Sequence, residues 1–192
     1  MLFIQHPLFI YNLFKMFKNP FQVAVTFALI ALIIKLVLMY LGVQHDSTQY
    51  ITYAYMLLIL CAIFFGIRSN KVMYDGPTSF GQDFKTGART ASFFALLVGL
   101  ITYVYYTQID PDFFPTKIAK SVAEYSTNIP DQIKEKGLVG AKQFFKEKIV
   151  ALDVIYSPMS QTTYTLFGLV FLGLFHSGVF AMLMKKFPGF KK

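Results

Sequence analysis

Residues 66–90 read GIRSNKVMYDGPTSFGQDFKTGART and form a short, strongly polar connector between two long apolar segments. Its charged side chains are Arg68, Lys71, Lys85 and Arg89 against Asp75 and Asp83. Asp75-Gly76-Pro77 is a turn signal, and Thr78 or Ser79 can then cap a helix that runs into the following apolar segment. The apolar segments on both sides are typical of membrane spans, so this connector sets how the spans are arranged.

Composition supports this interpretation. The 192-residue chain is 55% hydrophobic and only 15% charged, which would leave too much apolar surface uncovered in a soluble protein. The apolar residues also collect into long blocks. The net charge of +8 does not indicate nucleic acid, because the basic residues lie at the ends of the apolar segments, where membrane topology explains them. Cys61, the single cysteine, lies within an apolar block and is expected to be an inert thiol.

The sequence therefore predicts an all-α, polytopic membrane protein with one membrane domain. About 20 apolar residues cross the hydrocarbon core. The four segments that meet this length are residues 21–43, 49–67, 88–106 and 164–184. Residues 1–20 are interrupted by Pro7 and carry Asn12, Lys15 and Asn19 on one stripe, which predicts a helix lying in the membrane interface.

Within the connector, residues 68–87, we expect a short helix over residues 79–85 on the membrane surface. The expected partner-docking residues are Phe80, Gly81, Asp83, Phe84 and Lys85. Phe80 and Phe84 share a face that would dip into the interface, whereas Asp83 and Lys85 would face away from it. Gly81 lies on the turn between the two phenylalanines, where a bulky side chain could obstruct close approach.

Residues 107–162 are much more highly charged than the apolar segments, because they hold seven acidic residues and seven lysines. Pro115 at a helix start, followed by Ile118, Val122 and Tyr125, indicates one amphipathic helix. A second apolar stripe follows Pro130 and consists of Leu138, Ala141, Phe145, Ile149 and Leu152. Neither helix can bury its stripe alone, so each is expected to pack on the membrane surface, on the other helix or on a partner.

Orientation follows from lysine and arginine counts in short segments. The N-terminal segment holds two basic residues, and the connector and the C-terminal tail hold four each. The loop over residues 44–47 holds none. This predicts an inner-membrane protein with cytoplasmic termini and connector, and with a periplasmic helical loop over residues 107–162.

The connector and the sequence TQIDPDF after the third span resemble the small Bacteroidota membrane family catalogued as domain of unknown function 4199. The matching residues are Ser79, Phe80, Gly81, Phe84 and Gly87, and Asp110, Pro111, Asp112 and Phe113. The resemblance covers nearly the whole chain after residue 20, and it implies a helical outer loop, a fourth span and a basic tail. The chain departs from the family in its bulky apolar N-terminal extension. The resemblance implies no established activity.

Two ionisable residues lie within expected spans. Lys35 is about 12 Å from the outer end of the first span at 1.5 Å per residue, so it could snorkel outward, meet a counter-charge from a partner or serve transport. His176, near the middle of the fourth span, could be neutral and hydrogen-bonded across helices, or could relay protons. His6, His45 and His176 lie at different depths, so no metal site is expected.

No catalytic motif is present. The sequence has no glycine-rich phosphate loop, HExxH or GxSxG. Asp110-Pro111-Asp112 resembles a metal-binding DxD, but we interpret it as a helix stop followed by the next N-cap. No enzyme activity, cofactor or metal is therefore expected.

Small residues give the clearest packing signal. They recur every four residues, as Ala91, Ala95 and Gly99 in the third span and as Gly173, Ser177 and Ala181 in the fourth. Such faces allow helix backbones to approach closely. We expect the third and fourth spans to touch through these faces, which could serve folding or assembly.

Two function classes remain. The favoured hypothesis is a non-enzymatic accessory or scaffold subunit of a larger cell-envelope complex, with membrane lipids and a membrane protein as partners. The alternative is a small transporter or lipid-handling protein that uses Lys35 and His176.

Overall fold

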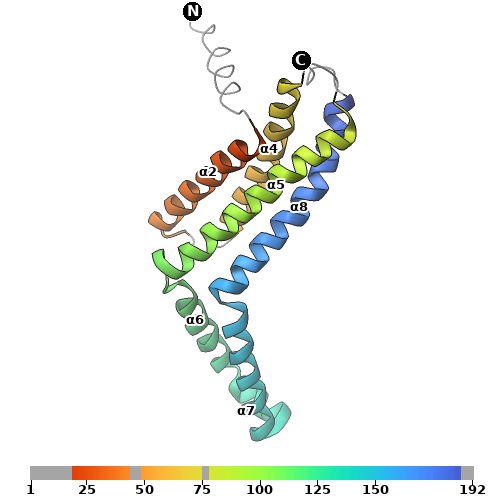
Figure 1. Cartoon of the computed structure of the whole chain (residues 1–192). Coiled ribbons are helices and arrows are strands. Elements are labelled where there is room, and N and C mark those ends of the chain that lie inside the picture. Colours follow the sequence, from red (N-terminus) through yellow and green to blue (C-terminus); the bar gives the residue numbers. More distant parts are fainter. Residues whose placement is uncertain (1–18, 44–48, 75–77, 187–192) are drawn as a thin grey trace, which may run out of the picture. The chain divides into compact units, whose positions relative to one another are not determined.

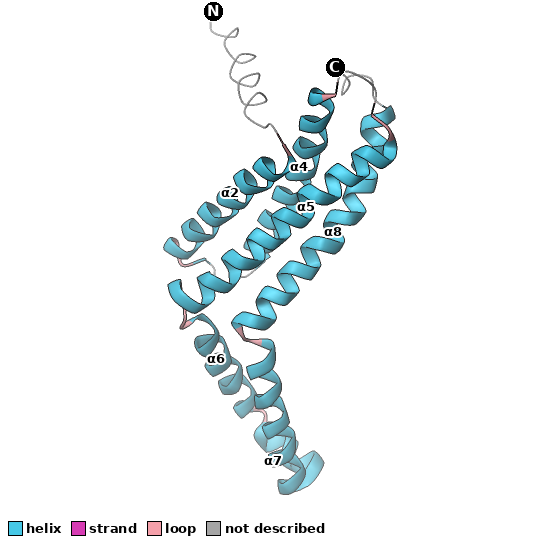
Figure 2. Ribbon diagram, in the orientation of Figure 1, coloured by secondary structure: helices cyan, strands magenta, loops and turns pink. Residues whose placement is uncertain are grey.

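The computed structural model describes residues 19–43, 49–74 and 78–186. The expected interfacial helix over residues 1–20 lies almost wholly outside the described residues. Figure 2 shows that the described chain is built from helices joined by short loops. The elements are α2 (Pro20–Tyr40), α4 (Gln49–Met73), α5 (Phe80–Val104), the π-helix η1 (Tyr105–Ile109), α6 (Phe113–Thr127), α7 (Ile129–Ile155) and α8 (Pro158–Lys186).

Four of the described helices are long and apolar enough to cross a membrane. They cover Pro20–Tyr40, Gln49–Met73, Phe80–Ile109 and Pro158–Lys185. The protein is therefore an all-α, multi-pass membrane protein, as the sequence predicted.

The helices on both sides of the connector are longer than expected. α4 continues to Met73 and α5 already begins at Phe80, so most of residues 68–87 belongs to these two helices. Residues 80–85 are helical, as expected, but they form the first turns of α5 and not a short helix confined to the membrane surface. Gly87 lies inside α5, and a single glycine weakens a helix by only about 1 kcal/mol, which is too little to end it.

The chain divides into two compact units. The first comprises Met1–Val98 and Leu166–Lys192, and the second comprises Gly99–Thr165. The first unit contains α2, α4 and most of α5 and α8. The second contains the end of α5, η1, α6, α7 and the start of α8.

In the first unit, α4 and α5 form a central pair, with α2 and α8 packed against it (Figure 1). Aromatic contacts join the helices. In α2, Phe21 packs edge-on against Phe93 of α5 and Phe27 stacks on Phe65 of α4, with ring centroids 5.3 and 5.7 Å apart. The neighbouring Phe64 of α4 contacts Phe180 of α8 at 6.1 Å.

The two central helices approach each other closely at a glycine of α4. A Cβ atom on Gly66 would lie 2.9 Å from the Cβ of Thr90 in α5, which is closer than real atoms come. Thr90 is fully buried, and its hydroxyl donates to the backbone carbonyl of Thr86 at 3.0 Å. Because this hydroxyl is hydrogen-bonded within α5, Thr90 can be buried against α4 without a hydrogen-bond acceptor from α4.

In the second unit, an aromatic cluster surrounds the start of α6. Tyr105 and Tyr106 of η1 and Phe113 and Phe114 of α6 are all buried. Tyr106 lies 5.0 Å from the ring centroid of Phe113 and 4.6 Å from that of Phe114. The cluster buries the first turn of α6 against η1.

The outer loop forms two helices, α6 and α7, that pack on each other. Gly137 interrupts α7 with φ of 71° and ψ of 169°, a left-handed conformation that favours glycine. In the expected second stripe, Ala141 and Leu152 are buried, whereas Leu138, directly after this turn, is 70% exposed. The described helices therefore cover only part of the stripe.

Candidate functional site

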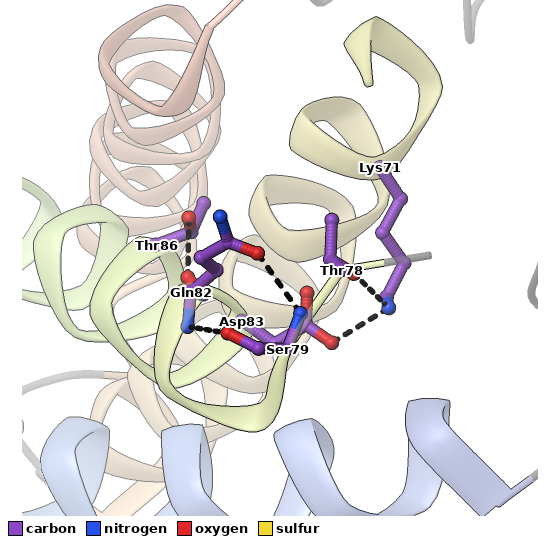
Figure 3. Close-up of polar contacts among 6 residues, drawn as sticks. All are labelled: Lys71, Thr78, Ser79, Gln82, Asp83 and Thr86. Atoms are coloured by element: carbon purple, nitrogen blue, oxygen red, sulfur yellow. Dashed lines mark hydrogen bonds and ion pairs between the residues drawn. The ribbon is translucent and has the colours of Figure 1, made fainter. Parts of the chain in front are cut away.

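A buried ion pair joins the end of α4 to the start of α5. Lys71 Nζ lies 2.6 Å from Asp83 Oδ2 and donates to Thr78 Oγ1 at 2.5 Å (Figure 3). The Asp83 side chain is fully buried and that of Lys71 is nearly so. One ammonium group therefore holds the last turn of α4, residue 78 and the first turn of α5 together.

Local sequence explains why α5 starts where it does. Ser79 Oγ accepts from the Gln82 backbone N–H at 3.3 Å, and Gln82 Oε1 accepts from the Ser79 N–H at 2.9 Å. This reciprocal capping box satisfies N–H groups that a helix start leaves unpaired. Of the two residues considered as caps, Ser79 is the one that caps α5. The cap places Asp83 in the first turn of α5, facing Lys71.

Asp83 does not lie where the sequence predicted. We expected it to face away from the membrane interface, as a docking residue, but it is 0% exposed. The expectation assumed a short helix lying on the membrane surface. In the continuous α5, position 83 lies on the same side as the buried Thr86 and Thr90, three and seven residues further on. Asp83 Oδ1 has no hydrogen-bond partner within the described chain, so the site is sensitive to loss of the lysine.

The other expected docking residues divide into two groups. Phe80, Gly81 and Lys85 are exposed at the start of α5. Phe84 is half-buried, stacks on Phe80 with centroids 6.2 Å apart, and lies 4.0 Å from where a Cβ on Gly178 of α8 would be. Phe84 therefore contacts α8 and is only partly available to a partner.

Gly81 has more room than expected. A Cβ added there would meet nothing within 4 Å, so a bulky residue at this position would not obstruct helix packing. The contrary expectation was wrong because Gly81 lies on the exposed side of α5.

The small faces of α5 and α8 do meet. A Cβ on Gly173 of α8 would lie 2.5 Å from the Cβ of Ala91, and a Cβ on Gly87 would lie 3.0 Å from Ser177 Oγ. Ser177 donates to the Gly173 carbonyl at 2.6 Å, so its buried hydroxyl is satisfied within α8. The predicted contact between these spans is confirmed. The remaining small residues, Ala95, Gly99 and Ala181, are buried.

Lys35 is 2% exposed within α2. The expectation that it snorkels outward does not match this burial, because a snorkelling amine lies at the surface. Val23, Ala24, Ala28 and Ala31 are the other buried residues of α2.

His176 bonds within its own helix. Its Nδ1 lies 2.8 Å from the Leu172 carbonyl, and because a carbonyl only accepts, Nδ1 carries the proton. The expected hydrogen bond across helices was therefore wrong. The imidazole is half-buried and packs edge-on against Phe175, with centroids 5.1 Å apart. His176 lies on α8 and Lys35 on α2, so the two belong to different helices packed on the central pair.

The DPDF sequence has a structural role in the second unit. Asp110 ends η1 and accepts from the Tyr105 hydroxyl at 3.3 Å, and Asp112 is the N-cap residue of α6. The Asp112 side chain makes no capping hydrogen bond. Among the described residues, no group of three or more His, Cys, Asp or Glu side chains is placed to hold a metal ion.

Sequence reasoning missed the partner of Asp83 and two close-approach residues. Lys71 was one of several basic residues in the connector, and nothing in the sequence singled it out. A search for small faces that extended beyond the expected spans would have included Gly87, which lies four residues before Ala91.

A model of the family described as "Protein of unknown function (DUF4199)" matches residues 22–186. This range includes α4, α5 and the whole of the outer loop. No curated protein and no solved structure matches the chain. The resemblance noted from the connector and the DPDF sequence is thereby confirmed.

Proposed function

This chain belongs to the DUF4199 family of proteins of unknown function, and we propose that it is a non-enzymatic accessory or scaffold subunit of a larger cell-envelope complex. One observation carries the proposal. The Lys71–Asp83 ion pair joins the end of α4 to the start of α5, and Phe80, Gly81 and Lys85 are exposed at that same end of α5. A rigid helix end with an exposed aromatic ring and a cation suits binding of a partner, because little ordering is needed when the partner docks.

The proposed location is the inner membrane, with the termini and the α4–α5 turn in the cytoplasm. Arg68, Lys71, Lys85 and Arg89 belong to this turn and its flanking helix ends, and short cytoplasmic segments are enriched in such residues. Exposed Lys85 and Arg89 would also meet anionic lipid head groups, each contributing about 1 kcal/mol near such a surface. Membrane lipids and a membrane protein are therefore the proposed partners.

Gly81 provides the test. Gly81→Leu adds a bulky group at an exposed position with open space around it, so it should leave the fold intact but obstruct a docked partner. We expect the protein, extracted from its own membranes in mild detergent, to migrate in native gels as part of a larger assembly, and Gly81→Leu to reduce that assembly.

Gly168→Leu is the matched control. Gly168 in α8 is also exposed and has nothing within 4 Å of an added Cβ. The proposal is contradicted if the protein migrates alone in every mild condition, or if both variants reduce the assembly equally.

A second candidate function, a small transporter or lipid-handling protein, is favoured by the burial of Lys35. Ionisable residues enclosed within spanning helices commonly mark substrate or ion paths. The intrahelical bond of His176 gives this candidate less support. The double variant Lys35→Leu with His176→Leu tests it, and full biological function in that variant would rule it out.

A further inference from the structure

A second apolar face runs along α7 between Gly137 and the end of the helix. Val139, Val150 and Val154 line an open groove of about 820 Å³ and are 81%, 55% and 63% exposed. Their positions along the chain place all three on one side of the helix. The buried residues Ala141 and Leu152 lie on the other side. The described helices therefore leave this outer valine face uncovered.

Polar side chains on the outer valine face favour a lipid surface over a partner helix. A partner helix would bury Gln143, which lies between Val139 and Val150 on the same side. Gln143 Nε2 donates to Glu147 Oε1 at 3.1 Å, so this pair can stay hydrated in a layer of lipid head groups. Charged side chains beside the face can stay there too, and their signs balance: they are Lys142, Lys146, Glu147 and Asp153.

The end of α7 is tied to the start of a membrane span within the second unit. Only Tyr156 and Ser157 separate α7 from α8, whose candidate span begins at Pro158. Ser160 Oγ in α8 donates to the Val154 carbonyl at 2.6 Å, and the Ser160 N–H donates to Ser157 Oγ at 3.1 Å. These bonds hold Val154 beside the start of the span, and the outer valine face continues from there along α7.

This connection lowers the affinity that the face must supply. Because α7 is held beside the bilayer by the chain itself, docking on that bilayer is intramolecular and gives up little freedom. A separate protein would need a larger surface, since stable interfaces usually bury at least about 1,200 Å². Three exposed valines supply only a small part of that area, whereas they are enough to hold a tethered helix on lipid.

We propose that the outer valine face docks on the lipid surface beside the start of α8, with residues 139–155 lying along the membrane. The three valines enter the interfacial layer, and Gln143 and the flanking charges remain among the head groups. The docking concerns whichever membrane face carries the outer loop, so it does not depend on orientation. It is also separate from the proposed docking surface on α5, so each can fail without the other.

The chain contains no tryptophan, so a single introduced tryptophan reports its own surroundings. Val139→Trp and Val150→Trp place it on the outer valine face, and Lys148→Trp is the matched control. Lys148 is also exposed but lies about 200° around the helix from Val150, at about 100° per residue. Each full-length variant is reconstituted into phosphatidylcholine liposomes with and without bromine on the acyl chains, because bromine quenches a tryptophan that contacts lipid.

We expect brominated lipid to remove most of the emission of Val139→Trp and Val150→Trp and to leave that of Lys148→Trp nearly unchanged. Adding Val150→Asp to Val139→Trp should reduce the quenching at position 139, because a carboxylate on the face opposes entry into the interface. Adding Lys148→Asp to Val139→Trp changes the charge on the other side of the helix and should leave that quenching in place.

The proposal is overturned if Val139→Trp and Val150→Trp are quenched no more than Lys148→Trp. Quenching at position 150 alone also overturns it, since only a helix that lies along the surface brings both positions into lipid. Emission that shifts to shorter wavelength without quenching overturns it as well, because a second copy or another protein then covers the face. Equal loss of quenching with Val150→Asp and Lys148→Asp would contradict the assignment of the face.

Discussion

Each charge of the Lys71–Asp83 pair lies at the helix end that favours it. Lys71 is in the last turn of α4, where unpaired carbonyls carry partial negative charge, and Asp83 is in the first turn of α5, where unpaired N–H groups carry partial positive charge. Such placement contributes up to about 2 kcal/mol in partly buried sites. The helix ends therefore offset part of the cost of burying the two ions.

Removing one partner should destabilise the protein strongly. Asp83→Asn or Lys71→Met leaves the other charge buried without compensation, which typically costs about 3–5 kcal/mol. Thermal unfolding in detergent should show a lower melting temperature for each single variant. The exposed Lys85→Met is the control and should melt with the unmodified protein.

The double variant Lys71→Met with Asp83→Leu distinguishes a charge effect from a packing effect. It removes both ions, so it should be more stable than either single variant. Additive losses in the double variant would show that the side chains contribute through their volume and not through the ion pair.

At the scale of the helices, hydroxyl groups bonded to their own backbone make close packing possible. Thr86, Thr90 and Ser177 each donate to the carbonyl four residues earlier. These short side chains fill little space, and their polar atoms need nothing from the neighbouring helix. Opposite them lie glycines 66 and 87, so α5 can approach both α4 and α8.

Gly173→Leu should disrupt the contact between α5 and α8. Its side chain would meet Ala91, whose Cβ leaves no room even for a methyl group, and overpacking of this kind costs about 1–3 kcal/mol or more. The expected result is a lower melting temperature in detergent. Gly168→Leu, in open space on the same helix, should have little effect. Equal melting of the two variants would contradict the close contact.

The contact between α5 and α8 could be predicted from the sequence, whereas the ion pair could not. A four-residue period of small side chains is a property of one helix face, so Ala91 and Gly173 were identifiable before the packing was known. Which of the four basic residues meets Asp83 depends on how α4 and α5 cross, and their close approach at Gly66 and Thr90 was not apparent from the sequence.

At the scale of the whole molecule, four helices are long and apolar enough to cross the membrane. When each crosses once, the connection between α4 and α5 and the connection between α5 and α8 lie on opposite membrane faces. The sequence predicted these spans well because a span is recognised from the length and apolar content of one continuous segment. It predicted the ends of α4 and α5 less well, because helices continue beyond the membrane wherever capping and packing support them.

Cysteine labelling tests this arrangement. In a Cys61→Ala background, Lys85→Cys and Lys134→Cys each introduce one exposed thiol. In intact cells, a membrane-impermeant maleimide that reaches the periplasm should label the cysteine at position 134 and not the one at position 85. Labelling at position 85 alone would reverse the proposed orientation.

The ion pair between α4 and α5 also bears on how the chain enters the bilayer. Lys71 and Asp83 are only twelve positions apart and neutralise each other only when both helix ends are together. We therefore expect the end of α4 to pack only after the start of α5 has been made, since burying one of these charges without the other is costly. Timed cross-linking of nascent chains should detect contact between the two helix ends only after residue 83 is synthesised, and Asp83→Asn should weaken that contact.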